Sequence, residues 1–424
     1  MHHLILGAGP AGVIAAETIR RQRPQDTITI VGDEPGPPYS RMAIPYLLSG
    51  KIDETGTWLR KGAGHYDEQR IKLVRDRVTA VDTNARTVKL ARGGDLGFDT
   101  LLIATGSTPL APPIPGINLP AVHPCWTLED ARHIAARAVQ GARVLQMGAG
   151  FIGCIIMEAL AARGVQLSVV EMGDRMVPRM MGATAGGMIK EWCQRHGVQV
   201  FTGTRVEAIS PGTPLSVRLS NGEKVAADLV ISATGVKPAI AFLENSGIRC
   251  QHGVLTDARM QTNVAGVYAA GDCAEAFDKS SGRHVVSAIQ PNAAEEGRVA
   301  GLNMAGQAAQ LKAVTQINVL DTLGLVSASF GEWQGVPGGE QVELTDRAAG
   351  RHLSLQFKGD VMVGCNSVGW TDHVGVLRGL VEGQVKLGPW KERLAQDPTR
   401  VMEAYLASAQ AQGQWRGAWD ARRR

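Results

Sequence analysis

The feature that most constrains this chain is an apolar run followed directly by a glycine-rich turn and a helix-like segment, a pattern that occurs twice. The turns read Gly7-Ala8-Gly9-Pro10-Ala11-Gly12 and Gly148-Ala149-Gly150-Phe151-Ile152-Gly153. In this frame the first glycine permits a tight turn, the second lets a pyrophosphate approach the backbone, and the third lets helix and strand pack closely. The sequence therefore predicts two dinucleotide sites, each with its phosphates at the N-terminus of a helix.

A carboxylate follows each turn at the end of the next strand-like run. Asp33 and Glu34 follow the first turn, and Glu171 follows the second. Such a carboxylate accepts hydrogen bonds from the ribose hydroxyls of the adenosine, and because Glu171 would repel a 2′-phosphate, the second site is expected to prefer NADH to NADPH. Arg175 and Arg179 lie further along and could take such a phosphate, although solvated or pyrophosphate-facing roles are the favoured interpretation for both.

Size and composition are those of a globular protein with several domains. A chain of 424 residues suggests about three domains at roughly 150 residues each. The 51 glycines follow no regular period, which excludes a collagen-like structure. The net charge of +4 is small, and it does not indicate the clustered basic residues of a nucleic-acid-binding protein. The closing Arg422–Arg424 is interpreted as a solvated end of the chain.

The cysteines and the apolar runs indicate a reducing compartment without a membrane anchor. The six cysteines are scattered, with no Cys-x-x-Cys pair and no zinc spacing, so neither a disulfide framework nor a metal site is expected. No run approaches the roughly 18 apolar residues of a membrane helix. His2 and His3 are interpreted as the start of a strand, and the turn at Gly7 begins too early for a signal peptide to precede it. A cytoplasmic protein is expected.

Three further motifs follow apolar runs. They are Leu101–Pro109, which contains Ala104-Thr105-Gly106, Leu229–Pro238, which contains Gly235, and Gly266–Cys273, which contains Gly271-Asp272. Their small residues allow a chain or a ligand to pass close to the backbone. Together with the two glycine turns, and over roughly residues 1–310, these motifs resemble the FAD- and NAD(P)-dependent pyridine nucleotide oxidoreductase superfamily.

The resemblance implies an α/β fold with two Rossmann-like dinucleotide-binding domains, an FAD domain interrupted by an NAD domain, and a C-terminal α+β dimerisation or interface domain. We predict the first part of the FAD-binding domain at residues 1–115, the NAD-binding domain at 116–240, the second part of the FAD-binding domain at 241–312 and the interface domain at 313–424. In the last domain, strands are expected at His352–Phe357 and Val361–Val368 and helices at Val374–Leu380 and Arg400–Ala407. A homodimer, or a subunit of a larger complex, is expected.

FAD and NAD(H) are the cofactors that the resemblance implies. The expected FAD site comprises Gly7, Gly9, Pro10, Ala11, Gly12, Asp33, Glu34, Arg41, Ala104, Thr105, Gly106, Gly271, Asp272 and Pro291. The expected NAD(H) site comprises Gly148, Gly150, Phe151, Ile152, Gly153, Glu171 and Gly235. By resemblance, Asp272 binds the ribityl chain and the adjoining phosphate region of the flavin, and the alternative is an ordinary helix N-cap.

The segment around Arg41 and Met42 narrows the subtype. Arg41 ends Pro38-Tyr39-Ser40-Arg41, which is similar to a motif of ferredoxin- and rubredoxin-reductase-like members whose arginine approaches the FAD pyrophosphate; the alternative is a surface arginine in a proline-rich loop. Met42 stands where members resembling NADH oxidases, peroxidases and coenzyme A disulfide reductases carry a redox cysteine. Because a thioether cannot form a thiolate, thiol–disulfide chemistry at the flavin is not expected. Tyr46 stands where ferredoxin-reductase-like members often have lysine, so the match to that branch is incomplete.

The segments Gly324–Gly331 and Val361–Gly364 resemble the flavoprotein portion of NADH-dependent nitrite reductases and their stand-alone relatives, and so does Gln290–Ala293, which leads into Glu296-Gly297-Arg298. The sequence therefore predicts an NADH-preferring flavoprotein that accepts a hydride from NADH and passes electrons to a redox partner, such as a ferredoxin, a rubredoxin or a metalloenzyme subunit. No catalytic residue stands out. Two alternatives stay open: an NADH oxidase or small-molecule reductase without a protein partner, and a flavin-bound sensing or assembly module without catalysis.

Overall fold

The computed structural model describes residues 1–279, 281–314 and 316–411, and the arginines Arg422–Arg424 lie outside the described residues. The chain forms two compact units, each assembled from separate stretches of sequence. The first comprises Met1–Leu110, Trp126–Ala131 and Val236–Val314, and the second comprises Ala111–Cys125, Arg132–Gly235 and residues 316–411. Each unit contains one of the two glycine turns. The bounds of the four segments expected from the sequence remain predictions.

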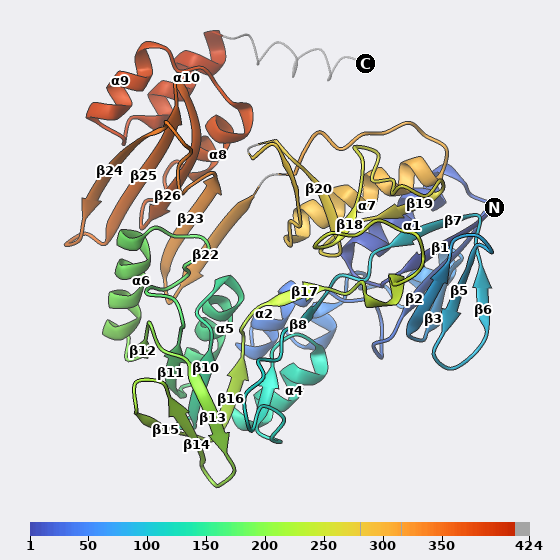
Figure 1. Ribbon diagram of the computed structural model, residues 1–424, viewed down its shortest axis with the longest axis horizontal. Helices are drawn as coiled ribbons and strands as arrows, with labels where there is room; N and C mark the ends of the chain where they lie inside the picture. The colour runs from blue at the N-terminus through green and yellow to red at the C-terminus, as the bar shows by residue number, and fades with distance from the viewer. Residues whose placement is uncertain (280, 315, 412–424) are drawn as a thin grey trace. The chain divides into compact units, whose positions relative to one another are not determined.

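A five-stranded parallel sheet forms the centre of the first unit, with the strand order β19-β7-β1-β2-β3 (Figure 1). Its strands are β1 (His2–Leu6), β2 (Thr27–Gly32), β3 (Ile71–Arg75), β7 (Thr100–Ile103) and β19 (Val267–Ala269). All four residues of β7, and Leu4 to Leu6 of β1, are buried. Burial on both faces explains why these strands are continuous apolar runs without a polar alternation.

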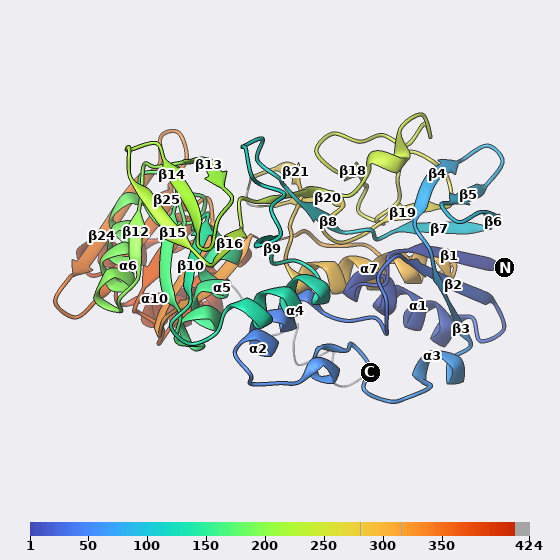
Figure 2. The ribbon, with the colours of Figure 1, turned by 90° about the horizontal axis from the view of Figure 1, so that it is seen from below.

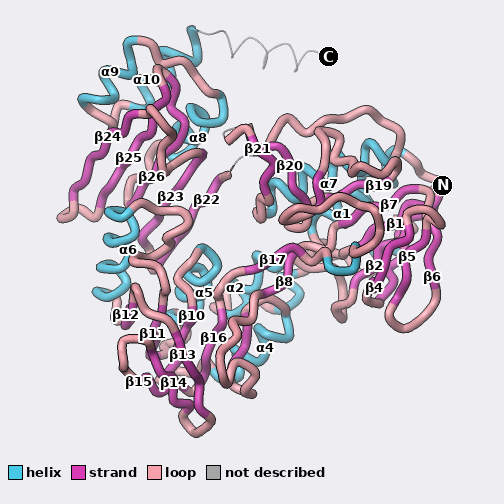
Figure 3. Tube along the Cα trace, viewed as in Figure 1, coloured by secondary structure: helices cyan, strands magenta, loops and turns pink. Residues whose placement is uncertain are grey.

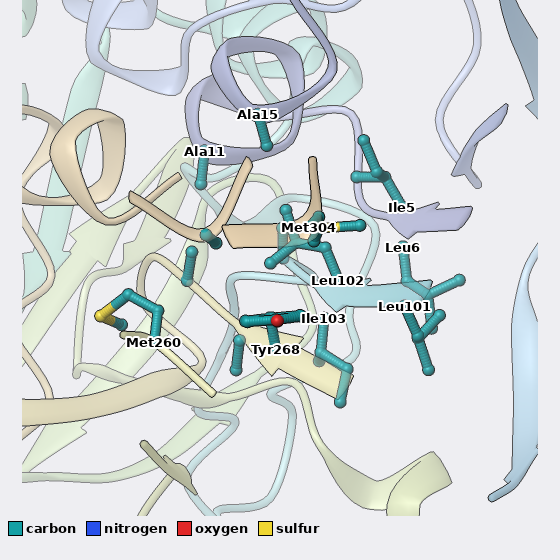
Figure 4. Close-up of a cluster of buried hydrophobic side chains, with 14 of the residues drawn as sticks. Ile5, Leu6, Ala11, Ala15, Leu101, Leu102, Ile103, Met260, Tyr268 and Met304 are labelled. Atoms are coloured by element: carbon teal, nitrogen blue, oxygen red, sulfur yellow. The ribbon is translucent and has the colours of Figure 1, made fainter. Parts of the chain in front are cut away.

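Two helices of the first unit, α1 (Pro10–Gln22) and α7 (Gln290–Met304), lie side by side (Figure 2). A Cβ atom on Gly297 would lie 2.3 Å from the carbonyl oxygen of Ala11, and one on Gly301 would lie 2.8 Å from that of Ala15. Glycine is needed at both places because the two backbones almost touch. Figure 4 shows Ala11, Ala15 and Met304 within the buried cluster that these helices share with the sheet.

Smaller elements complete the first unit. The strands are β4 (Val78–Asp82), β5 (Thr87–Leu90), β6 (Asp95–Gly97), β8 (Ser107–Pro109), β17 (Val236–Pro238), β18 (Val254–Leu255), β20 (Ala274–Asp278) and β21 (Arg283–Val285). They pair as β4-β5-β6, β17-β8 and β18-β20-β21. The short helices are α2 (Ile44–Leu48) and α3 (His65–Glu68), with 3-10 turns at Arg41–Ala43, Glu54–Thr57 and Ala241–Leu243.

The second unit contains a parallel sheet of the same design, with the order β12-β11-β10-β16-β9. Its strands are β9 (Val122–Pro124), β10 (Arg143–Met147), β11 (Gln166–Val170), β12 (Gln199–Phe201) and β16 (Leu229–Ser232), with α5 (Phe151–Ala161) and α6 (Ala183–Arg195). Strand β10 takes the central place that β1 has in the first unit, and the second glycine turn follows it. An antiparallel sheet of β13 (Val206–Ser210), β14 (Leu215–Leu219) and β15 (Lys224–Ala227) adjoins it. Helix α4 spans Leu128–Arg137, and the division between the two units falls within it, after Ala131.

The C-terminal part of the second unit is an antiparallel sheet followed by helices (Figure 3). Its order is β22-β23-β26-β25-β24, formed by β22 (Ile317–Thr322), β23 (Leu325–Gly331), β24 (Glu340–Asp346), β25 (Arg351–Lys358) and β26 (Val361–Val368). The helices are α8 (Val374–Gly383), α9 (Pro389–Gln396) and α10 (Val401–Ala411). The two strands and two helices expected here are confirmed, within a few residues at their ends. The α/β fold with an α+β C-terminal part is therefore confirmed.

Within the described residues, no helix combines the length and the apolar character that crossing a membrane requires.

Candidate functional site

The first glycine turn joins β1 to α1 in the first unit. Gly7 has a φ of +114°, and a Cβ atom there would lie 2.0 Å from the carbonyl oxygen of Ala104. A Cβ atom on Gly12 would lie 2.1 Å from the carbonyl oxygen of Gly7. Gly9, the N-cap of α1, is different, because no atom beyond its own chain neighbours lies within 4 Å of the place of its Cβ. The turn is therefore closed on its protein side and open at its second glycine, beside the unpaired N–H groups of the helix N-terminus.

The second glycine turn has the same geometry in the second unit. Gly148 has a φ of +95°, and its Cβ would lie 2.3 Å from the carbonyl oxygen of Ala233. A Cβ on Gly153 would lie 2.5 Å from the carbonyl oxygen of Gly148, whereas no atom beyond the chain neighbours lies within 4 Å of the Cβ position on Gly150. Gly150 is the N-cap of α5, whose first residues are Phe151 and Ile152. Both turns therefore offer the same open second glycine to an anion.

The carboxylate of Glu171 lies beside the second turn. Its Oε2 accepts a hydrogen bond from the Ala149 N–H at 2.7 Å, and its Oε1 accepts one from the Gly173 N–H at 2.7 Å. Arg175 is held within its own loop, because it donates to the Met181 carbonyl at 2.8 Å and pairs with Asp174 at 2.7 Å. Glu171 is thus fixed at the turn, and Arg175 is committed elsewhere. Gly235, with a φ of +117°, follows the Ala233 segment that meets the turn.

Residues far apart in the sequence meet in the first unit, among them Ser107 and Asp272 from the two parts of the predicted FAD domain. Thr105 donates to the Ala239 carbonyl at 2.9 Å, and Gly106 has a φ of +67°. The Ser107 hydroxyl donates to Asp272 Oδ2 at 2.9 Å, and burial raises the pKa of the Asp272 carboxyl above its usual value. Asp272 lies in the turn before β20, with no helix following it, so the alternative of a helix N-cap is wrong. Pro291 lies in the first turn of α7.

Arg41 is held by several contacts. Its Nη2 pairs with Glu34 Oε1 at 2.5 Å, its Nη1 donates to the Ser107 carbonyl at 3.2 Å, and its guanidinium lies 4.9 Å from the centre of the Trp126 ring. The Tyr39 hydroxyl also donates to Glu34. Arg41 is therefore fixed in place and is not a free surface arginine.

Asp33 behaves differently from Glu34. It pairs with Arg77 at 3.1 Å, and 48% of its side chain is exposed. The structure thus brings Glu34, and not Asp33, into contact with Arg41.

Met42 and Tyr46 are both exposed, at 47% and 55%. Five of the six cysteines are buried and the sixth, Cys250, is exposed; all are free. Cys273 follows the Gly271-Asp272 motif, but it is fully buried, and burial raises the pKa of its thiol to about 11. A buried thiol that stays protonated at neutral pH is a poor nucleophile.

Several residues of this region were not expected from the sequence. The Ser107 hydroxyl donates to Asp272, and the Trp126 ring lies against Arg41 and donates its indole N–H to the Ser107 carbonyl. Glu296 of α7 accepts a hydrogen bond from the Gly271 N–H at 2.6 Å. Ser107 directly follows the Ala104-Thr105-Gly106 motif, which is a signal that could have identified it. Glu296 is 1% exposed, and its place in a helix sequence carries no sign of that burial.

Two open glycine turns, each at the N-terminus of a helix and each followed by a carboxylate, define a protein that binds two dinucleotides. Residues 1–297 match the pyridine nucleotide-disulphide oxidoreductase family, and the chain belongs to this family. It is an NAD(P)H-dependent flavoprotein oxidoreductase that uses FAD and NAD(H). The family membership that the five sequence motifs indicated is confirmed.

Individual relatives span most of the chain. The epsilon subunit of an NADH-dependent phenylglyoxylate dehydrogenase from Aromatoleum evansii is 31% identical over 403 residues, 94% of this chain and 96% of that protein. Rhodocoxin reductase from Rhodococcus erythropolis is 31% identical over 318 residues, 74% of each chain. A solved structure, an NAD-dependent persulfide reductase from A. fulgidus, is similar with a TM-score of 0.85 and 27% identity, covering 92% of this chain and 78% of that one.

Proposed function

We propose that FAD binds along the turn Gly7–Gly12, that NADH binds along the turn Gly148–Gly153, and that electrons pass from NADH through the flavin to a redox protein. The observation that carries this proposal is the matching arrangement of the two turns, each open only at its second glycine. FAD, when bound, supplies the centre that accepts a hydride and releases electrons. The protein supplies position, charge and exclusion of water.

The FAD site combines residues of the first unit. Gly9 and the N-terminus of α1 receive the pyrophosphate, and Arg41 adds a positive charge that its contacts with Glu34 and Trp126 hold in place. Asp272 receives the ribityl hydroxyls, because its carboxylate retains free lone pairs beside the Ser107 bond. Glu34 receives the adenosine ribose. These assignments, and the domain boundaries given above, are proposals supported by geometry.

The NAD(H) site centres on Glu171. Each of its carboxylate oxygens accepts one backbone hydrogen bond and can accept another from a ribose hydroxyl. A 2′-phosphate would meet that negative charge, and Arg175 is already bound to Met181 and Asp174. We therefore propose that NADH is preferred over NADPH.

The electron acceptor is proposed to be a small iron–sulfur protein or another subunit's metal centre. The names of two relatives support this, since one is a reductase named for rhodocoxin and the other a subunit of a dehydrogenase. Neither the thioether of Met42 nor the buried thiol of Cys273 is suited to relay electrons as a thiolate. We further propose a homodimer or complex subunit, and a cytoplasmic location in which the exposed Cys250 stays reduced.

The acceptor is tested by steady-state NADH oxidation with purified holoenzyme. NADH consumption should be slow in air and should rise at least about tenfold when a ferredoxin or rubredoxin is added as the electron acceptor. Rapid NADH consumption coupled to oxygen uptake, without any carrier, would contradict a protein acceptor. The control is the same assay with NADPH, which should be slower at equal concentration.

A second candidate is a small-molecule reductase without a protein partner. The similarity to the persulfide reductase structure favours it. Turnover that depends on a low-molecular-weight persulfide, and that no carrier protein stimulates, would establish this alternative. NADH failing to reduce the flavin at all would instead favour a sensing or assembly module.

A further inference from the structure

Glu296 is a fully buried carboxyl group beside the proposed FAD site. It lies on α7, its side chain is 1% exposed, and its Oε2 accepts a hydrogen bond of 2.6 Å from the N–H of Gly271. Gly271 has a φ of +79° and directly precedes Asp272. Glu296 therefore holds the turn that presents Asp272.

The surroundings of Glu296 disfavour a negative charge. The N–H group that Glu296 binds belongs to Gly271, and a Cβ atom on Gly271 would lie 3.4 Å from the Cβ of Ala11 in α1, the helix whose N-terminus faces the proposed pyrophosphate. Among the described residues, no Lys, Arg or His pairs with Glu296, and the Gly271 N–H is its single hydrogen-bond partner. A buried carboxylate with one donor and no cation is unfavourable.

The charged groups nearby are few. The charge of Asp272 disfavours a second negative charge on Glu296. The ionised form of Asp272 is itself favoured by the Ser107 hydroxyl and by the positive charge of Arg41. On α7, Glu295 and Arg298 pair with each other at 2.6 Å near the surface, and Cys273 is a neutral thiol. Ala11, Ala15 and Ala16, the buried residues of α1 on this side, carry no charge. Of the two neighbouring carboxyls, Glu296 is thus the one that retains a proton, and burial raises its pKa to about 8.

We propose, resting on the FAD site proposed above, that Glu296 is a positioning residue which holds the Gly271–Asp272 turn in its uncharged form, so that flavin binding depends on its proton. FAD brings two phosphate charges to the nearby end of α1 and therefore disfavours the ionised carboxyl further. Binding should take up a proton at pH values where the apoprotein has released it.

The test is the dissociation constant of FAD from the apoprotein, measured by flavin fluorescence between pH 6.5 and pH 9, for the wild-type protein and Glu296→Gln. An apoprotein pKa of about 8 predicts that the wild-type constant rises about tenfold from pH 7 to pH 9. The substituted glutamine side chain cannot ionise but still accepts from the Gly271 N–H, so the variant should bind within about threefold of wild type at pH 6.5 and should lose most of the pH dependence.

The matched control is Glu295→Gln, an exposed carboxyl one residue earlier on the same helix, which should keep the wild-type pH profile. Glu296→Ala leaves the Gly271 N–H without its acceptor and should weaken FAD binding at every pH, by about tenfold. If that variant does not fold, the Glu296→Gln variant still decides the question. Calorimetry in two buffers of different ionisation enthalpy should show proton uptake at pH 8 for wild type and less for Glu296→Gln.

The outcomes separate this inference from the function on which it rests. A wild-type apoprotein that does not bind FAD at any pH contradicts the proposed FAD site. FAD binding with the same pH profile in wild type and Glu296→Gln overturns the role of Glu296 and leaves the FAD site standing. A flat profile in the Glu296→Gln variant alone establishes the role of the proton.

Discussion

Two glycines of the first turn should respond in opposite ways to replacement by alanine. A methyl group on Gly12 would lie 2.1 Å from the carbonyl oxygen of Gly7, a distance that real Cβ atoms do not show. The obstructing atom belongs to the backbone, so α1 must move away from β1. Such overpacking destabilises a folded protein by about 1–3 kcal/mol. Gly12→Ala should therefore lower the free energy of unfolding of the apoprotein.

Gly9→Ala should leave that stability intact. Gly9 has φ −80° and ψ −175°, which alanine adopts readily, and no atom beyond its chain neighbours lies within 4 Å of the new methyl group. Replacement of glycine under these conditions stabilises a protein by about 0.4–1 kcal/mol. The methyl group would fill only the space proposed for the pyrophosphate. FAD should bind at least about tenfold more weakly, a loss of about 1.4 kcal/mol.

The assay combines urea unfolding of the apoproteins with FAD titration by fluorescence. The reasoning fails if Gly9→Ala binds FAD as wild type does, or if it destabilises the apoprotein as much as Gly12→Ala. The second turn provides an independent repeat, because Gly150 is open and Gly153 is closed in the same way. There the ligand measured is NADH.

Other residues give shorter predictions. Glu171→Ala should weaken NADH binding about tenfold or more while leaving NADPH binding unchanged or tighter, as measured by titration of the holoenzyme; an unchanged preference would show that this carboxylate does not select the coenzyme. Burial lowers the pKa of His3 below its usual value of 6.5. As the pH drops below about 6.5, the unfolded chain therefore binds a proton before the folded protein does, and the free energy of unfolding should fall. His3→Gln should flatten this part of the stability curve, and an unaltered curve would exclude His3 as its source. Native protein should expose one reactive thiol, Cys250, to a maleimide reagent, and reduction by NADH should expose no second one. Arg41→Ala should weaken FAD binding about tenfold, since it removes a charge-assisted contact worth about 1.5–3 kcal/mol; equal affinity would place Arg41 outside the site.

The sequence predicts the two turns well, because their chemistry is local. Gly7 and Gly148 need a positive φ, and the third glycine of each turn lies against the first, so the pattern reports a geometry that other residues do not permit. The strands β25 and β26 are equally predictable from the sequence, since the side chains of their apolar runs form part of the hydrophobic core of the C-terminal sheet.

Contacts between distant segments cannot be predicted from the sequence in the same way. Nothing in the sequence shows that Glu34 pairs with Arg41 while Asp33 pairs with Arg77. Glu296 has the sequence appearance of a solvent-exposed helical residue, and only the packing of α7 against α1 and the Gly271 turn buries it. Burial is a property of the assembled chain, and for that reason the most unusual carboxyl group of the site could be found only in the structure.

The most direct test of the account is an anaerobic titration of the purified holoenzyme with NADH, followed by the visible absorption of the flavin. The account predicts that an equimolar amount of NADH bleaches the flavin band, and that Glu171→Ala requires a higher concentration for the same bleaching. A flavin spectrum that NADH leaves unchanged would contradict the central claim that this protein transfers a hydride from NADH to FAD.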